Sequence, residues 1–558
     1  MSKLPAADFM SIKNQKITLE RFAISLFWLS VSVYLLITWS NHTPNRDWDY
    51  AAAHSYLGQA LFRGWYQDDW LVAANGSTYL WPVTDIVLFL PRLFGSPQIG
   101  NLLITLIVVY VTIKLLFGIS RLVFKSQTSN SQSHSAVVLS ILSPYWLAEI
   151  GTTFSSWVSA PLVLAGLFFL LRYQNEGNRK GDLFLGGVTL GLSFALKLTN
   201  IIFILSSLIL LIVLMVRNSS SLRQNVKNLT YFVCGLFAGI IPIIPWWVFT
   251  FFSTGSPVFP WYNKLFKSPY YPLENSKDTR WEWSIPDSIL NIPTGWFAGT
   301  PVAELKSVDI RIGIIFVLYV ILLSVYFYKN IFRLTLQTFL EERYMRSKPL
   351  TREPYEIQMF FHLWIVTSTL LWIYFFGYVR YWITVEILLG IAIVHLICML
   401  LRAYRLRNLA IGVVLALTVT SLNPPNWTAA SSVAGIGTFE QPWSSELTHE
   451  VSKFSGVLFV EGSPVAFLRE TSPGVTNMIN LDFPNTPEKF KEIARDGLKR
   501  SSLSLVTTKG EGEIANLPNK ISTWLGESDK VEVNCRELKG PITITYHFCE
   551  IKLRIVAN

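Results

Sequence analysis

Acidic and imidazole side chains gather in the polar stretch that follows the first long apolar block of the chain. The stretch opens with Asp47 and Asp49, continues with His54 and Asp69, and closes with Asp85. A carboxylate at a membrane surface can accept a proton from an attacking hydroxyl, or hold a divalent cation that neutralises a phosphate. Any one of these acids is equally consistent with a solvated loop. Their spacing favours chemistry, because Asp49 and His54 fall on one predicted short amphipathic helix, suited to lie along a membrane facing a lipid-borne substrate.

Two cations stand at the ends of apolar blocks. Lys197 closes one block, and Arg380 follows another with Tyr381 beside it. Such side chains suit a phosphate, because the planar Arg fork donates two hydrogen bonds and Lys supplies a point charge. We interpret Lys197, Arg380 and Tyr381 as substrate-binding residues. The alternative for both cations is ordinary anchoring at the membrane boundary.

Several further polar residues have two interpretations each. Asp85 lies among apolar residues, which indicates either a pocket or the solvent face of an amphipathic helix. Asp278 and Arg280 lie in a second polar stretch rich in Trp and Tyr, which suits a sugar-stacking platform or an interfacial aromatic belt. Glu149 is either a cation ligand or a helix-end charge, and His54 either orients Asp49, satisfies a loop carbonyl or touches substrate. The cofactor is unknown, with a divalent cation as one possibility.

The composition defines what must position these residues. Of the 558 residues, 51% are hydrophobic and only 15% are charged, which excludes an ordinary soluble enzyme. The apolar residues fall in blocks of roughly 20, the length that crosses a hydrocarbon core of about 30 Å. We therefore predict a polytopic α-helical membrane protein with about 11 spans. The predicted spans are 21–39, 99–119, 135–150, 157–171, 183–198, 201–216, 231–252, 310–328, 359–376, 384–401 and 409–421.

The net charge of +10 is mostly a signal of orientation. Lys and Arg concentrate in alternate connections between the blocks, as they do in cytoplasmic loops. This pattern places the amino terminus in the cytoplasm and argues against a nucleic-acid partner. An odd number of spans then leaves the carboxyl-terminal part outside.

Two domains follow from this arrangement. Residues 1–422 form the predicted transmembrane module with external loops 40–98 and 253–309, and residues 423–558 form an external, periplasmic α/β domain. The tail has strand-like runs at 456–460, 503–507 and 542–548 and a helix-like run at 487–498. Its two cysteines, Cys535 and Cys549, either form a disulfide, as the oxidising side of a membrane permits, or stay as unpaired thiols in neighbouring strands.

The order of these motifs resembles a known family. An Asp follows the first span, a His stands five residues on, a further Asp comes next, and Pro82 precedes Asp85 by three residues. The pattern is similar to that of polytopic glycosyltransferases of the GT-C class, and closest to the bacterial branch related to the protein O-mannosyltransferases and aminoarabinose transferases. The further matching segments are 149–154 (EIGTTF), 195–200 (ALKLTN), 254–263 (TGSPVFPWYN), 266–272 (FKSPYYP), 278–280 (DTR) and 378–381 (YVRY).

The resemblance covers most of the membrane module and does not reach the tail. Two positions depart from the family pattern: Trp81 stands where Asn precedes the Pro, and Ser155 and Ser156 stand where relatives carry an acid. The second departure weighs against a two-acid metal site at Glu149.

The resemblance implies transfer of one sugar from a polyprenyl-phosphate donor to a glycan, lipid or protein acceptor at the outer face of the inner membrane, with inversion at the anomeric carbon. We assign the base to Asp49, which occupies the family position, with Asp47 as the second candidate. We assign the donor phosphate to Lys197 and Arg380, which lie at the predicted external membrane boundary. Two other functions remain open. A transporter or flippase of lipid-linked glycans would place ionisable residues along a central path, and a glycan polymerase or ligase would rely on Arg and His in a late loop.

Overall fold

The computed structural model describes most of the chain. The described residues are 49–86, 97–124, 130–150, 152, 154–175, 179–217, 222–273, 308–340, 355–401, 403–424, 445–483, 485–500, 502–526, 531–540 and 544–553. The predicted first span at 21–39 lies outside them, as do Asp47, Asp278 and Arg280.

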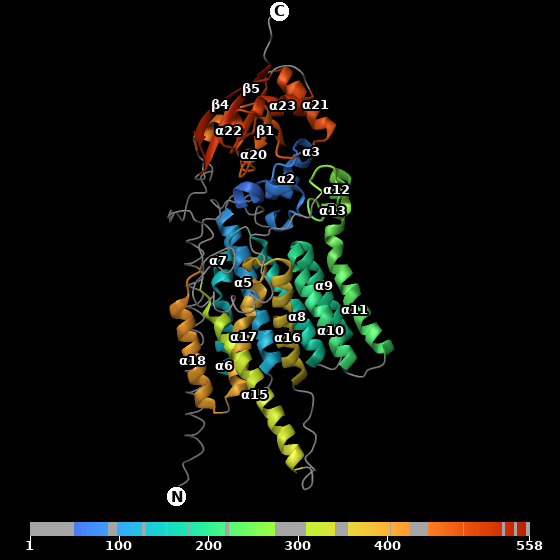
Figure 1. The fold of residues 1–558 in the computed structure, drawn as a ribbon, viewed down its shortest axis with the longest axis vertical. Helices are drawn as coiled ribbons and strands as arrows, with labels where there is room; N and C mark the ends of the chain where they lie inside the picture. Colours follow the sequence, from blue (N-terminus) through green and yellow to red (C-terminus); the bar gives the residue numbers. More distant parts are fainter. Residues whose placement is uncertain are drawn as a thin grey trace, which may run out of the picture.

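A bundle of long helices makes up one end of the molecule, and a sheet domain makes up the other (Figure 1). The helices of the bundle are α5 (Pro97–Phe124), α6 (Asn130–Ile141), α7 (Pro144–Glu149), α8 (Ser155–Asn175), α9 (Lys180–Leu196), α10 (Ile201–Arg217), α11 (Leu222–Ile240), α12 (Ile244–Thr254), α15 (Ile310–Leu340), α16 (Tyr355–Phe375), α17 (Ile383–Leu400) and α18 (Tyr404–Ser421). The predicted spans inside the described residues are mostly helical, although 135–150 is divided between α6 and α7, and 231–252 is divided between α11 and α12. The seven that are long and apolar enough to cross a membrane begin at Leu103, Ser155, Leu198, Leu222, Ile310, Glu356 and Ile383.

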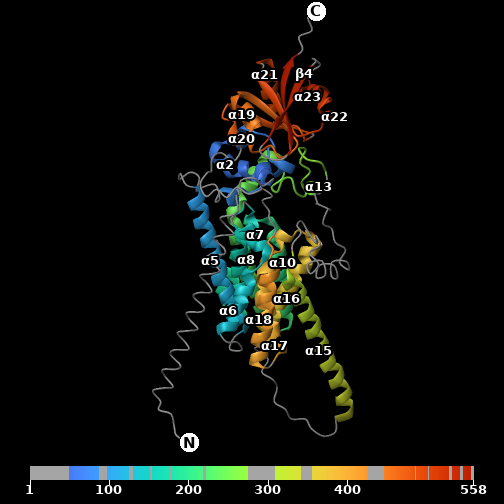
Figure 2. The ribbon, with the colours of Figure 1, turned by 90° about the vertical axis from the view of Figure 1, so that its left-hand side faces the viewer.

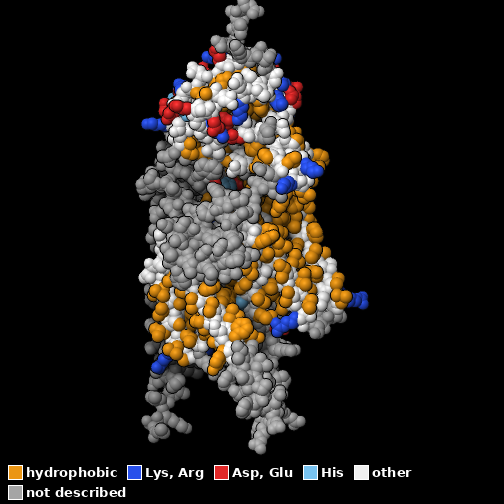
Figure 3. All heavy atoms as spheres, in the orientation of Figure 1, with side chains coloured by type: hydrophobic (Ala, Val, Ile, Leu, Met, Phe, Trp, Pro, Cys, Tyr) orange, Lys and Arg blue, Asp and Glu red, His pale blue; other side chains and the backbone are white. Residues whose placement is uncertain are grey.

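The remaining predicted spans are weaker by length or composition. Helix α6 has 12 residues and α9 has 17, and α18 carries two arginines in its first turn. The chain is thus a multi-pass helical membrane protein, while the count of 11 spans stays a prediction. On the face seen in Figure 3, hydrophobic side chains cover the flanks of the helices and charged side chains gather over the sheet domain. Such an apolar belt suits a lipid environment, since Ile107 and Phe237 are 62% and 67% exposed.

Glycines allow two of the helices to touch along their backbones. A Cβ atom on Gly187 of α9 would lie 2.2 Å from the carbonyl oxygen of Phe232, and one on Gly239 of α11 would lie 2.2 Å from that of Val188. Membrane helices associate through such close packing, because lipid supplies little hydrophobic drive between them. Helices α9 and α11 therefore pack closely along their backbones, and α9 ends at Leu196, one residue before Lys197.

The carboxyl-terminal part is a mixed α/β domain. Its sheet has the order β2-β1-β3-β5-β4, in which β1 pairs in parallel with β2 and β3, while β5 pairs antiparallel with β3 and β4. The strands are β1 (Gly456–Glu461), β2 (Val475–Asn480), β3 (Leu503–Thr507), β4 (Val531–Lys539) and β5 (Thr545–Leu553). The helices are α19 (Glu446–Lys453), α20 (Leu468–Thr471), α21 (Glu488–Lys499), α22 (Glu511–Ile514) and α23 (Leu517–Leu525). The predicted runs correspond to β1, β3, β5 and α21, whereas β2 and β4 were not anticipated.

The described part of the first loop, residues 49–86, lies between the bundle and the sheet domain (Figure 2). It forms a π-helical turn (Tyr50–His54), α2 (Ser55–Arg63), α3 (Trp65–Asp68) and a 3-10 turn (Ala74–Tyr79). The sequence predicts that the helix carrying His54 lies along the membrane. Instead Tyr56 and Leu57 are buried in a core shared with the sheet domain, and only its last turn, with Leu61 and Phe62, exposes apolar side chains.

Backbone hydrogen bonds fasten this loop to the sheet. The Trp70 amide donates to the carbonyl of Met478 at 2.8 Å, and the Asn480 amide donates to the carbonyl of Trp70 at 3.0 Å, so the loop extends the sheet beside β2. The Phe467 amide donates to the carbonyl of Ala51 at 3.0 Å. Because Ala51 follows Asp49 by two residues, the sheet domain fixes the backbone next to that carboxylate.

A disulfide joins the two edge-side strands of the sheet. Cys535 of β4 and Cys549 of β5 stand opposite each other, with a Cα–Cα distance of 4.0 Å, and their sulfur atoms are bonded. Of the two alternatives for these cysteines, the structure has the disulfide and not the unpaired thiols. The two cysteines do lie in neighbouring strands, as the second alternative supposed.

Removing this disulfide should loosen the β4–β5 pair. The two cysteines are separated by 14 residues in the sequence, and closing a loop of this size contributes about 3 kcal/mol. In the Cys535→Ser/Cys549→Ser variant we expect amide exchange in β4 and β5 to accelerate about 100-fold. Hydrogen–deuterium exchange on the full chain measures this. Full alkylation of both cysteines without a reductant would show that the bond is absent.

Candidate active site

The centre of the candidate site is an ion pair between two residues far apart in the sequence. Arg380 Nη1 lies 2.8 Å from Asp49 Oδ2, across a separation of 331 residues. Asp49 immediately precedes the π-helical turn Tyr50–His54. Arg380 lies in the short 3-10 turn Val379–Tyr381 that leads into α17. Their side chains are 31% and 18% exposed, so both remain within reach of a ligand. The acid predicted as base and the cation predicted for phosphate thus meet at one point.

Aromatic rings surround the Arg380 guanidinium. Its Cζ lies 5.0 Å from the ring centre of Phe154, 5.5 Å from that of Tyr378 and 5.7 Å from that of Tyr381. A cation within about 6 Å of a ring face is attracted by the ring quadrupole. These contacts hold a charged group at the boundary of the bundle without neutralising its charge.

A second cation, Lys197, also contacts the Tyr381 ring. Lys197 Nζ is 4.5 Å from the Tyr381 ring centre and donates a hydrogen bond to Ser156 Oγ. Lys197 is extended, with φ −149° and ψ 108°, because α9 ends one residue earlier; the side chain of Asn200 caps that helix end by donating to the carbonyl of Ser193. Both predicted phosphate ligands therefore contact the Tyr381 ring. Their two positive charges lie around this ring, and that of Arg380 also pairs with the Asp49 carboxylate.

His54 pairs with Asp85, another acid considered for the site from the sequence. Its Nδ1 lies 2.5 Å from Asp85 Oδ1, so Asp85, which is 5% exposed, fixes the orientation of the imidazole. That His54 orients Asp49 stays a prediction. His54 still belongs to the same group of residues, because its ring packs edge-on to Phe154 at 6.5 Å. Phe154 thus connects the His54–Asp85 pair to Arg380.

Glu149 lies at the end of α7, fully buried. Three or more His, Cys, Asp or Glu side chains arranged to hold a metal ion do not occur in the part of the chain that the structure describes. Glu149 as a metal ligand stays a prediction. Its position matters in another way, since the described residues that follow α7, Ile150, Thr152 and Phe154, precede α8 and the site.

Asp69, which the sequence groups with the candidate acids and which we predicted to bind substrate, is buried against the sheet domain. It is 1% exposed, its Oδ2 accepts from Arg469 Nε at 2.9 Å, and its Oδ1 accepts from the Met478 amide at 2.9 Å. Arg469 also donates to the carbonyls of Val475 and Thr476. The structure places Asp69 in the attachment between the external loop and the sheet domain, because a buried carboxylate requires such partners.

The attachment through Asp69 should weaken as the pH rises. Burial raises the pKa of Asp69 from 3.8 to about 7, against the opposing attraction of Arg469. Between these values the folded chain holds a proton that the unfolded chain has released, so this contribution to stability is largest in acid and is lost as the pH rises through about 7. We expect the melting temperature of wild type minus that of Asp69→Asn to fall between about pH 5 and about pH 8. A difference that rises with pH would contradict this assignment.

Three residues that contact the cations of the site were not predicted as site residues from the sequence. Phe154 and Ser156 lie in or beside the motif at 149–154, and Tyr378 opens the motif at 378–381. Their position in or next to these motifs was the available signal. Their residue types do not indicate that Phe154 and Tyr378 contact Arg380 or that Ser156 contacts Lys197. Asp47, Asp278 and Arg280 lie outside the described residues, so their roles stay predictions.

Known protein structures share this architecture. The chain aligns with the crystal structure of ArnT from Cupriavidus metallidurans in the apo state at 14% identity and a TM-score of 0.50, over 94% of this chain and 98% of that one. It also aligns with the same protein bound to undecaprenyl phosphate, at 12% identity and a TM-score of 0.48, over 93% and 98% of the two chains. A third match is the oligosaccharyltransferase of Archaeoglobus fulgidus in complex with Zn and sulfate, at 13% identity and a TM-score of 0.40, over 80% and 61%.

No family model matches the sequence, and no curated protein matches it significantly. The similarity to ArnT extends over nearly all of both chains, including the sheet domain. At this level of identity it establishes the fold: the chain has a GT-C glycosyltransferase-like fold with a carboxyl-terminal sheet domain.

Proposed function

We propose that this chain is an inverting glycosyltransferase that moves a monosaccharide from a polyprenyl-phosphate donor to an acceptor hydroxyl. The observation that carries the proposal is the Asp49–Arg380 ion pair with Lys197 beside it, at the end of the bundle next to the sheet domain. One group can take a proton and the other two can stabilise a phosphate. The GT-C-like fold supports the same reaction class.

In this proposal the carboxylate of Asp49 accepts the proton of the acceptor hydroxyl. The acceptor oxygen forms a bond to the anomeric carbon while the bond from that carbon to the phosphate oxygen breaks on the opposite face. The released polyprenyl phosphate keeps the bonding electrons, and the charges of Arg380 and Lys197 stabilise it. One substitution at the carbon inverts its configuration.

The short Asp49–Arg380 contact gives this mechanism a binding step. A carboxylate and a phosphate compete for the same guanidinium, and in an in-line substitution they must stand on opposite sides of the sugar. Donor binding therefore separates the pair: Arg380 turns to the phosphate, and Asp49 is left to the acceptor. Before binding, the pair neutralises two charges at the membrane boundary.

The Lys and Arg distribution supports a cytoplasmic amino terminus and a site on the outer face of the inner membrane. A glycan, a lipid or a protein would serve as acceptor in the same chemistry. Mass spectrometry of lipid-linked sugars and cell-surface glycans, with and without the protein, tests the proposal. Loss of the protein should leave an unconsumed lipid-linked monosaccharide on the outer leaflet and remove one sugar from an acceptor. If the protein were instead a flippase, its loss would leave that lipid on the cytoplasmic leaflet.

A further inference from the structure

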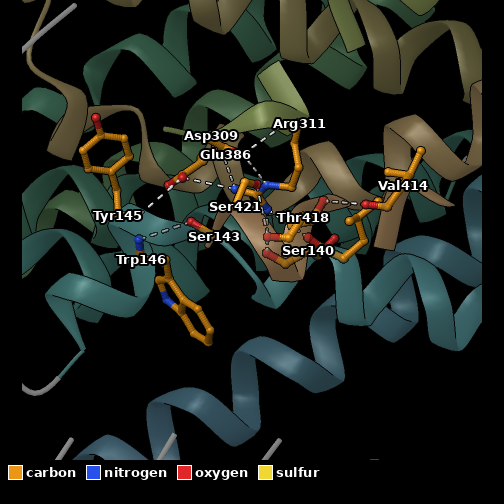
Figure 4. Close-up of polar contacts among 11 residues, drawn as sticks. Ser140, Ser143, Tyr145, Trp146, Asp309, Arg311, Glu386, Val414, Thr418 and Ser421 are labelled. Carbon is orange, nitrogen blue, oxygen red and sulfur yellow. Dashed lines mark hydrogen bonds and ion pairs between the residues drawn. The ribbon is translucent and has the colours of Figure 1, made fainter. Parts of the chain in front are cut away.

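Three charged side chains are buried together beneath the site, at the junction of four helices. Arg311 is the second residue of α15, Asp309 precedes that helix, and Glu386 lies in the first turn of α17. Their side chains are at most 1% exposed. Figure 4 shows Arg311 reaching between the two carboxylates and the carbonyl end of α6. Charges buried in a membrane protein are costly, so such a group needs a function to explain it.

The hydrogen bonds of Arg311 use the whole guanidinium. Nε donates to Asp309 Oδ1 at 2.8 Å, and Nη2 donates to Asp309 Oδ2 at 2.6 Å and to Glu386 Oε1 at 3.1 Å. Nη1 donates to the carbonyls of Leu139 and Ser140 at 2.9 and 3.2 Å, in the last turn of α6. Lysine cannot reproduce this planar set of five donors.

Two of the connected segments lead to the candidate site. Glu386 Oε1 also accepts from the amide of Tyr145, at the start of α7. From there α7 runs to Glu149, shortly before Phe154, and α17 runs back through Trp382 to the turn that holds Arg380 and Tyr381. Phe154 and Arg380 are the two sides of a cation–π contact of 5.0 Å. The buried Asp309–Arg311–Glu386 group therefore connects α7, which leads towards Phe154, with α17, which follows the turn that holds Arg380.

Close packing leaves little freedom at this junction. A Cβ atom on Gly390 of α17 would lie 2.2 Å from the amide nitrogen of Ser140 in α6. Since α6 and α17 are packed closely against each other, we expect a change in the Arg311 contacts to act on the bond from Glu386 to the Tyr145 amide, and so on the position of α7.

We propose that Asp309, Arg311 and Glu386 are positioning residues that hold Arg380 against Phe154 and so set the affinity of the site for a phosphate. The part of this inference that concerns phosphate rests on the proposed function, whereas the part that concerns the position of residue 380 does not.

The first experiment needs no substrate. Arg380→Cys is labelled with a charged maleimide in three backgrounds, with the reaction of the parent cysteines subtracted: otherwise wild type, Arg311→Lys and Arg172→Lys. Arg172 pairs with Asp182 at the opposite end of α8, so its variant is a matched weakening of an Arg–Asp pair about 25 Å from the site. We expect the labelling rate to change in Arg311→Lys alone. Equal rates in all backgrounds would overturn the inference.

The second experiment measures binding of polyprenyl monophosphate to the detergent-purified chain with Arg380 intact. We expect the Kd to rise about tenfold in Arg311→Lys, the size expected from losing one charge-assisted hydrogen bond, and to stay unchanged in Arg172→Lys. In an Arg380→Ala background, Arg311→Lys should have no further effect. An equal effect with and without Arg380 would show a merely structural role and contradict the proposal.

Two outcomes separate this inference from the proposed function. If labelling responds to Arg311→Lys but the wild type does not bind polyprenyl monophosphate, positioning holds and the proposed function fails. If Arg311→Lys does not insert, Glu386→Gln replaces it, because glutamine keeps the shape and an acceptor oxygen while removing the charge. Unchanged labelling and unchanged binding in that variant would overturn the inference.

Discussion

Asp49→Asn should lower kcat by about 10²–10⁴-fold, the usual contribution of a general base, with donor binding retained or tightened. The amide has the shape of the carboxylate but does not take the acceptor proton. It also competes less for Arg380, whose Nη1 lies 2.8 Å from Asp49 Oδ2. The measurement is steady-state transfer by purified protein, with donor binding measured separately.

Asp68→Asn is the matched control for this variant, because Asp68 is an exposed acid on the same loop and its backbone carbonyl, not its carboxylate, is bonded to Asn477. Its transfer rate should equal that of wild type. Unchanged transfer in a correctly inserted Asp49→Asn protein would remove the base assignment.

Arg380→Ala should raise the KM for the donor by roughly 10- to 100-fold, since hydrogen bonds to charged groups contribute about 1.5–3 kcal/mol. The change removes the guanidinium that contacts Phe154, Tyr378 and Tyr381, and it also leaves Asp49 without this partner. Arg380→Lys should recover only part of the affinity, because an ammonium group lacks the planar fork. Donor titrations in the transfer assay measure this.

A surface arginine provides the control for that prediction. Arg536 of the sheet domain pairs with Glu450 at an exposed position, and such pairs contribute little. Arg536→Ala should leave the donor KM unchanged. If Arg380→Ala lowered kcat and left the donor KM at the wild-type value, the phosphate role of Arg380 would be wrong, and a role in holding Asp49 would replace it.

The sequence predicted the helical bundle and its end residues because membrane helices leave long, unbroken apolar signals. Lys197 and Arg380 were identifiable as cations at the ends of such blocks. Their common neighbour Tyr381 was also identifiable. The contact of Lys197 with that ring was not, because it depends on how the end of α9 packs against the turn that precedes α17. Pairing across 331 residues, as between Asp49 and Arg380, leaves no local pattern.

Two failures have a physical cause. Asp69 looked like one more site acid, but its partner Arg469 is 400 residues away and comes from a domain that the family resemblance does not reach. The helix that carries His54 has an apolar face that suits a membrane, and the same face suits a protein domain; burial of Tyr56 and Leu57 distinguishes the two.

One missed feature carried a readable signal. Arg311 and Glu386 are charges within the first turns of strongly apolar helices, where an ionisable residue is unusual enough to mark a functional or paired position. The sequence does not reveal that they pair with each other, because α15 and α17 are separated by another helix along the chain.

The most direct test of the account is a single-turnover reaction of the purified chain, in lipid nanodiscs, with a polyprenyl-phosphate monosaccharide and an acceptor extract. Free polyprenyl phosphate and glycosylated acceptor are quantified together by mass spectrometry, for wild type and for Asp49→Asn. We predict that wild type releases one polyprenyl phosphate for each sugar transferred and that Asp49→Asn binds the donor without cleaving it. Donor cleavage at equal rates in the two proteins, or donor left intact by wild type, would contradict it.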